Sequence, residues 1–141
     1  MKKLFLLLSF ILVVVVGCGN GHVSGSGTVK YSTGELVPNG TIFFSTPQFN
    51  YTGTINNGVF ELGGLKKGDG LPPGQYKVHL IGTEITESTD DIPLFDAKFN
   101  NPETSGIIIE VKSGEKNRFE ITVEKPSQKE QQTIESDIPV E

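Results

Sequence analysis

Residues 118–124, Arg-Phe-Glu-Ile-Thr-Val-Glu, alternate strictly between polar and apolar side chains. Because successive side chains of a β-strand point to opposite faces, this period of two predicts a half-buried strand with Phe119, Ile121 and Val123 facing the core. The same alternation predicts three further strands, over residues 23–31, 76–80 and 107–111. Shorter stretches rich in β-branched and aromatic residues predict three more, over residues 41–45, 51–55 and 59–62.

Turn signals separate these stretches. Thr33-Gly34 ends the first strand, and Ser113-Gly114 joins the last two. Asn57-Gly58 predicts a tight hairpin, because both residues tolerate a positive φ. About seven short strands with turns between them, and no convincing helical pattern, predict an all-β sandwich or barrel.

Two longer connections interrupt the strand pattern, over residues 66–74 and 82–105. Within the second, residues 92–99 read Ile-Pro-Leu-Phe-Asp-Ala-Lys-Phe, which predicts one helical turn that lays Leu94, Phe95 and Phe99 on the core. An ordered connection of this length in a small domain is either packed against the core or functional.

Length and composition limit the classes of protein that fit. The chain has 141 residues, which is room for one domain. It has 17 acidic and 12 basic side chains, and this acidic net charge argues against nucleic-acid binding. A single cysteine excludes an internal disulfide framework and any multi-cysteine metal site.

The N-terminal residues predict a targeting signal. Lys2 and Lys3 precede a run from Leu4 to Val16 that is apolar except for Ser9 and is followed by Gly17 and Cys18. A basic start, an apolar segment and small residues at its end are typical of a secretory signal peptide. The apolar run is shorter than the roughly 20 residues that a spanning helix needs.

Val15-Val16-Gly17-Cys18 resembles the lipobox of bacterial lipoproteins, in which the cysteine is lipidated and becomes the new N-terminus. The resemblance implies removal of residues 1–17 and an acylated, palmitate-type anchor on Cys18, outside the cytoplasm. Several acyl chains hold firmly, since each buried methylene contributes about 0.8 kcal/mol. The alternative is a soluble secreted protein with a free thiol. By the same resemblance, Gly19 after the cysteine favours the outer membrane in cells that have one.

These signals divide the chain into four parts. A signal peptide covers residues 1–17, a short Gly/Asn tether residues 18–21, and a β-domain residues 22–124. The last part, residues 125–141, is polar and acidic with few apolar residues and no aromatics, which predicts a disordered tail.

Five segments of the domain form an ordered pattern, the last with a Pro-Gly-x-Tyr turn at Pro73–Tyr76; they are residues 25–31, 34–44, 53–55, 60–62 and 68–78. In this order they resemble carboxypeptidase regulatory-like domains. Residues 98–107 are similar to a motif of small bacterial lipoproteins built on this domain. The resemblance implies a seven-stranded Greek-key β-sandwich of the transthyretin type, and it does not imply an activity. Phe99 departs from the family, whose members often have Tyr there, and the tail after Glu124 is an extension.

Few side chains suit metal or catalytic chemistry. His22 and His79 fall on the polar sides of their strands, where solvated surface histidines are the simpler interpretation. Four carboxylates in the long connections are weak candidates for calcium, which takes 6–8 oxygen ligands; they are Asp69, Asp90, Asp91 and Asp96. Turn formation explains such residues equally well.

Other motifs are absent or ambiguous. No Gly-x-Ser-x-Gly elbow and no phosphate-binding loop occur. Four aromatic residues could form a sugar-binding platform or simply fill the core of a domain without tryptophan; they are Phe43, Phe49, Tyr51 and Phe95.

The sequence therefore predicts a lipid-anchored envelope module with a non-catalytic structural or binding role and no cofactor. Its expected partners are the membrane, through Cys18, and an envelope protein or polysaccharide. The alternative is a calcium- or glycan-binding accessory domain that serves a separate enzyme, and a hydrolase is the least favoured hypothesis.

Overall fold

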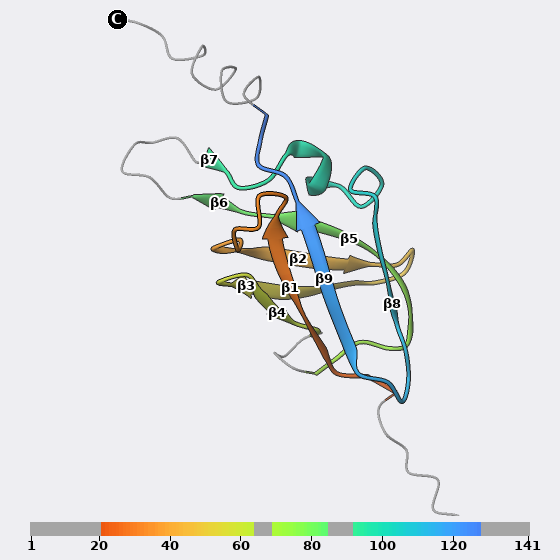
Figure 1. The fold of residues 1–141 in the computed structure, drawn as a ribbon. Helices are drawn as coiled ribbons and strands as arrows, with labels where there is room; N and C mark the ends of the chain where they lie inside the picture. Colours follow the sequence, from red (N-terminus) through yellow and green to blue (C-terminus); the bar gives the residue numbers. More distant parts are fainter. Residues whose placement is uncertain (1–20, 64–68, 85–91, 128–141) are drawn as a thin grey trace, which may run out of the picture.

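The structure is a computed structural model, and it describes residues 21–63, 69–84 and 92–127. Seven strands form one mixed sheet in the order β8-β5-β2-β3-β4-β1-β9 (Figure 1). They are β1 (Gly25–Tyr31), β2 (Asn39–Ser45), β3 (Asn50–Asn56), β4 (Val59–Glu61), β5 (Gly74–Ile81), β8 (Ile107–Val111) and β9 (Asn117–Val123). The all-β prediction is confirmed. A short pair, β6 (Thr83–Glu84) with β7 (Ile92–Pro93), and the 3-10 helix η1 (Ala97–Asn100) complete the fold.

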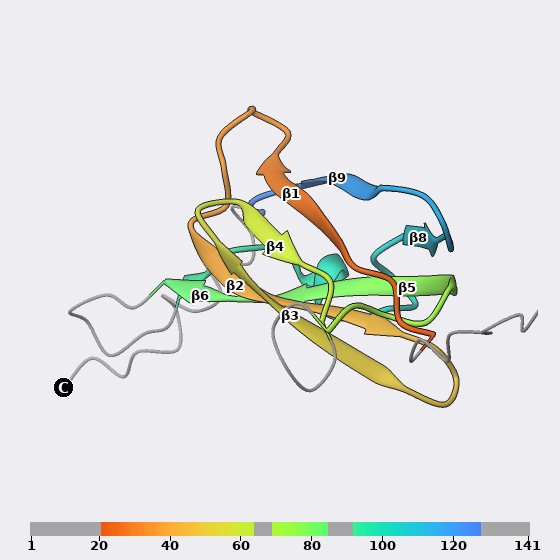
Figure 2. The same ribbon diagram turned by 90° about the horizontal axis from the view of Figure 1, so that it is seen from below.

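The sheet turns over on itself between β3 and β4. These strands pair only through Asn56 and Val59, whereas β1 and β9 run parallel over seven residue pairs and every other neighbouring pair is antiparallel. In Figure 2 the strands β4, β1 and β9 lie over β2, β3 and β5. The sheet is therefore nearly closed, with β8 and β9 as its two edges.

The predicted turns form where the sequence places them. Asn57 has φ 46° and Gly58 has φ 74°, and the two residues join β3 to β4 as a tight hairpin. Gly34 and Gly114 also have positive φ, at the end of β1 and between β8 and β9. Although β9 follows β8 directly in the chain, the two strands do not pair.

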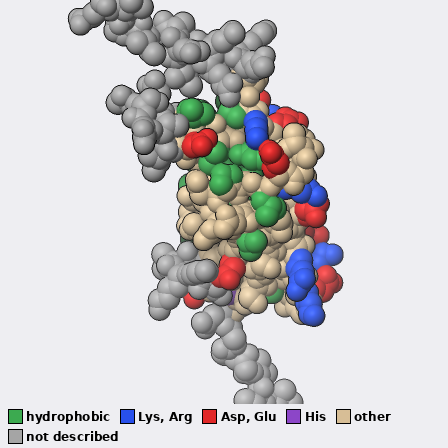
Figure 3. Space-filling view, turned by 60° about the vertical axis from the view of Figure 1, so that its left-hand side comes forward, with side chains coloured by type: hydrophobic (Ala, Val, Ile, Leu, Met, Phe, Trp, Pro, Cys, Tyr) green, Lys and Arg blue, Asp and Glu red, His purple; other side chains and the backbone are tan. Residues whose placement is uncertain are grey.

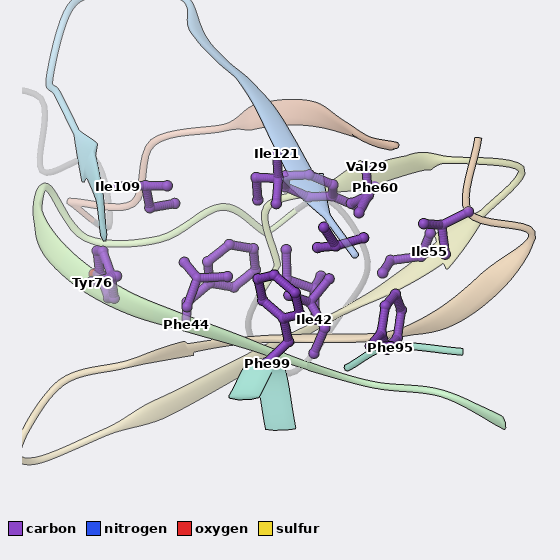
Figure 4. Packing of buried hydrophobic residues seen from close by; sticks show 14 of the residues in the cluster. Val29, Ile42, Phe44, Ile55, Phe60, Tyr76, Phe95, Phe99, Ile109 and Ile121 are labelled. Carbon is purple, nitrogen blue, oxygen red and sulfur yellow. The ribbon is translucent and has the colours of Figure 1, made fainter. Parts of the chain in front are cut away.

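One hydrophobic core fills the space inside the sheet (Figure 4). Tyr76, Val78 and Leu80 face inward with at most 3% exposure, which confirms the register expected for this strand. A Cβ atom at Gly27 would lie 2.3 Å from the Phe60 ring, so this inward position of β1 has no room for a side chain.

The connection over residues 92–99 packs on the core, as its sequence predicts. Leu94, Phe95 and Phe99 are all buried, and η1 supplies the helical turn. The short pair of β6 and β7 was not expected. Residues 1–20, with the proposed signal peptide and Cys18, lie outside the described residues, as do residues 128–141 of the tail.

Within the described ranges, no helix has the length and apolar character needed to span a bilayer.

Candidate binding surface

An open groove of about 530 Å³ lies between the two edge strands. Residues 107–110 of β8 form one wall and residues 118–122 of β9 form the other. Figure 1 shows the two strands diverging from the turn that joins them. The groove is thus the place where the sheet fails to close.

Both walls of the groove are free strand edges. β8 pairs only with β5, and β9 pairs only with β1, among the strands that the structure describes. In a β-ladder alternate backbone N–H and C=O groups point away from the paired neighbour, and at an edge they are available to another chain. The groove therefore offers backbone donors and acceptors on two sides.

Apolar side chains form the floor of the groove. Ile109 and Ile121 are 6% and 4% exposed, and Ile107 and Phe119 are half-buried against the core. Ile108 differs from them, because its side chain is 64% exposed.

The rim carries three charged side chains. Glu120 forms an ion pair with Lys30 of β1. Glu110 and Arg118, both exposed, have no ion-pair partner within the described ranges. Beside the apolar floor, the rim therefore presents one charge of each sign that has no ion-pair partner among the described residues.

Two polar side chains fix the ends of β8. At one end the buried Asn117 side chain accepts a hydrogen bond from Lys112 N and donates one to Lys112 O, both at 2.9 Å. At the other end the buried Ser105 hydroxyl donates to Val78 O and accepts from Ile107 N at 3.2 Å. These contacts tie one end of β8 to β5 and the other end to the start of β9.

The two histidines contact different aromatic side chains. His79 stacks on Phe43 with ring centroids 4.5 Å apart, and its Nδ1 lies 3.5 Å from Ser45 Oγ. Burial against this surface lowers the pKa of His79. His22 is exposed and meets Tyr51 edge-on at 6.4 Å.

The carboxylate candidates are placed only in part. Asp69 is exposed, and Asp96 caps η1 by accepting a hydrogen bond from Lys98 N at 3.1 Å. Asp90 and Asp91 lie outside the described residues. In the part of the chain that is described, no three His, Cys, Asp or Glu side chains gather as a metal site would require. Asp96 therefore has a local structural role.

The four aromatic candidates do not form one platform. Phe95 is buried in the core, and Phe43 lies half-buried on the outer face of β2. Phe49 and Tyr51 are neighbours at the β2–β3 turn, with ring centroids 6.3 Å apart.

Sequence reasoning missed the groove, although one signal pointed to it. The strict alternation of residues 107–111 breaks at Ile108, where an isoleucine occupies a position on the polar face. An apolar residue on the solvent side of a strand marks an interaction surface or an unprotected edge.

No known protein family matches the chain, and no curated protein does. Among solved structures, the chain is similar to the Bacillus anthracis TIE protein, with 23% identity and a TM-score of 0.47 over 74% of this chain and 17% of that one. It is also similar to a DUF3823 family protein from Bacteroides ovatus, with 16% identity and a TM-score of 0.44 over 72% of this chain and 44% of that one. The chain therefore spans less than half the length of either protein.

Proposed function

We propose that this protein is a non-catalytic binding module of the bacterial cell envelope, held at the membrane by a lipid on Cys18. It takes up an extended polypeptide segment in the groove between β8 and β9. The observation that carries this proposal is the pair of free strand edges that face each other across an apolar floor. Addition of a strand to an exposed edge is a recurring mode of peptide recognition.

We also propose that the domain is a seven-stranded Greek-key β-sandwich of the transthyretin type and that it follows a cleaved signal peptide. The way in which the sheet turns over between β3 and β4 supports a two-layered arrangement. The lipobox-like residues 15–18 support the signal peptide and the anchor.

The chemistry of the groove defines its ligand. A bound segment must be extended, because only an extended backbone can pair with β8 or β9. Apolar side chains at alternate positions would face the floor formed by Ile109 and Ile121. A basic side chain would meet the exposed Glu110. Each backbone hydrogen bond contributes about 0.5–1.5 kcal/mol net, so a few of them with apolar burial give moderate affinity.

The test uses the lipidated protein in detergent micelles and a seven-residue peptide in which valine alternates with lysine and threonine. Hydrogen exchange read by mass spectrometry should show new protection in residues 107–111 and 117–123. The same peptide with N-methylated amides should bind much more weakly, since it cannot donate to the edge. Equal binding of both peptides, or protection elsewhere, would overturn the proposal.

The anchor is tested separately. A Cys18→Ser protein should lose lipidation and leave the membrane fraction, because it has no acyl chains to bury. An unmodified Cys18 in the native protein, read by mass spectrometry, would refute the anchor and leave the peptide experiment unaffected.

A further inference from the structure

The tip of the β2–β3 hairpin holds a large apolar side chain in solvent. Thr46 N donates to Phe49 O at 2.8 Å, and Phe49 N donates to Thr46 Oγ1 at 3.0 Å, so the turn is closed from both sides. Phe49 is nevertheless 64% exposed, which makes it, with Ile108, one of the two most exposed large hydrophobic residues that the structure describes. A turn this well bonded presents the ring at a fixed place.

A chain of aromatic rings supports Phe49 from behind. The Phe49 ring lies 6.3 Å from Tyr51, and Tyr51 meets Tyr76 edge-on at 6.0 Å. The Tyr76 hydroxyl in turn donates to Pro72 O at 2.7 Å. Because Tyr76 is buried, the row of rings connects the exposed tip to the core.

The start of the domain lies at the same end of the molecule. The His22 ring packs edge-on against Tyr51, and Val23 pairs with Leu71. Cys18 precedes His22 by four residues, which span at most about 14 Å when fully extended. A lipid on Cys18 therefore keeps the Tyr51–Phe49 end of the domain close to the bilayer surface.

The hairpin itself carries no charged side chain, and the nearest one, Lys77 of β5, lies opposite Ser45 at its base and forms an ion pair with Glu103. No Asp, Glu, Lys or Arg occurs between Glu35 and Glu61, a stretch that contains both strands of the hairpin. Figure 3, which brings forward the side of the molecule away from this tip, shows charged side chains of both signs on that face. The tip can thus enter the lipid headgroup layer without the cost of burying a charge.

We propose that the hairpin tip, with Phe49 at its apex and Tyr51 behind it, contacts the lipid bilayer and fixes the orientation of the domain on the membrane. The proposal rests on the lipid anchor proposed above. Aromatic side chains favour the interface between water and hydrocarbon, and a second weak contact strengthens an acyl anchor. The tip would then act as that second contact.

The experiment exploits the absence of tryptophan from the chain. A Phe49→Trp protein, natively lipidated, is reconstituted into vesicles of phosphatidylethanolamine and phosphatidylglycerol. The control is Val59→Trp, because Val59 is 53% exposed and lies beyond the far end of β3, roughly 20 Å from the tip at about 3.3 Å per residue. Fluorescence is recorded with and without lipids brominated near the headgroup.

The expected result is a blue-shifted emission from the Phe49→Trp protein that brominated lipids quench, and an emission from the Val59→Trp protein that they leave unchanged. Equal emission from both variants, in protein that floats with the vesicles, would overturn the membrane contact while the anchor stands. Protein that does not float and carries an unmodified Cys18 would overturn both the anchor and the contact that depends on it.

Discussion

The two edge strands of the sheet are alike on their inner faces and different on their outer faces. Ile109 of β8 and Ile121 of β9 are buried to a similar degree in the same core. On the outer face, β9 carries Arg118, Glu120 and Thr122, whereas β8 carries Ile108 and Glu110. Charged side chains on an edge discourage pairing with another chain, and an exposed apolar edge invites it. The comparison indicates that β8 is the edge more open to a partner strand.

The largest expected effect tests the likeness of the inner faces. Ile109→Ala and Ile121→Ala should each lower the free energy of unfolding by about 2–5 kcal/mol, because each removes a buried side chain and leaves a cavity. Urea unfolding measures the effect. Glu110→Ala is the matched control and should stay within about 0.5 kcal/mol. An Ile109→Ala variant as stable as this control would show that the inward register of β8 is wrong.

A smaller loss is expected where the end of β8 is tied to β9. Asn117→Ala should cost about 1–3 kcal/mol, because it leaves the backbone N–H and C=O of Lys112 without their partner. Hydrogen exchange should also speed up in residues 107–111. Lys116→Ala, one residue away and exposed, is the control. Unchanged exchange in the Asn117 variant would mean that the side chain does not hold this end of β8 in place.

The difference between the outer faces is tested by moving a charge onto β8. Ile108→Lys should weaken binding of the valine-rich peptide by at least about tenfold, or about 1.4 kcal/mol, while the free energy of unfolding changes by no more than about 0.5 kcal/mol. Ile81→Lys is the matched control, since Ile81 is 48% exposed on β5 outside the groove. An equal loss of peptide affinity in both variants would show that β8 is not the strand that binds the peptide.

The smallest effect concerns His79 of β5, the strand that pairs with β8, whose ring stacks on Phe43 of β2. Burial lowers the pKa of His79 in the folded state, so the neutral ring is favoured by folding. Its contribution to stability is complete above the unfolded pKa of about 6.5 and is lost as the pH falls below that value. His79→Gln should therefore flatten the decline in unfolding free energy between about pH 7 and pH 5. Parallel curves for the variant and the wild type would contradict this.

Local features of the fold could be predicted from the sequence. The alternation over residues 76–80 lies inside β5, and Asn57-Gly58 forms the hairpin that its φ preferences require. The apolar spacing in residues 92–99 likewise predicted the helical turn and its buried side chains. In each case a few neighbouring residues decide the outcome.

Features that depend on distant segments could not be predicted. The parallel pairing of β1 with β9 joins opposite ends of the domain, and no local pattern encodes it. Without the strand order, the sequence could not tell that residues 107–111 and 117–123 are edges. Phe49 and Phe95 show the same limit, because only the tertiary fold decides that Phe95 is buried and Phe49 is not.

The capping role of Asp96, in contrast, could be predicted from neighbouring residues, since an aspartate before a helical turn commonly binds a backbone N–H.

The parallel pairing of β1 with β9 also has a mechanical meaning. The chain enters β1 at one end of the domain and leaves β9 at the opposite end, so a pull between the N-terminal and C-terminal ends of the chain draws the two strands along each other in shear. All seven residue pairs, from Gly25 and Asn117 to Tyr31 and Val123, then carry the load together. A force-extension measurement from the two termini should show one high rupture peak, whereas pulling from Thr33, just beyond β1, and the C-terminus should open the pair one bond at a time. The strand pair thus forms a force-bearing clamp across the domain.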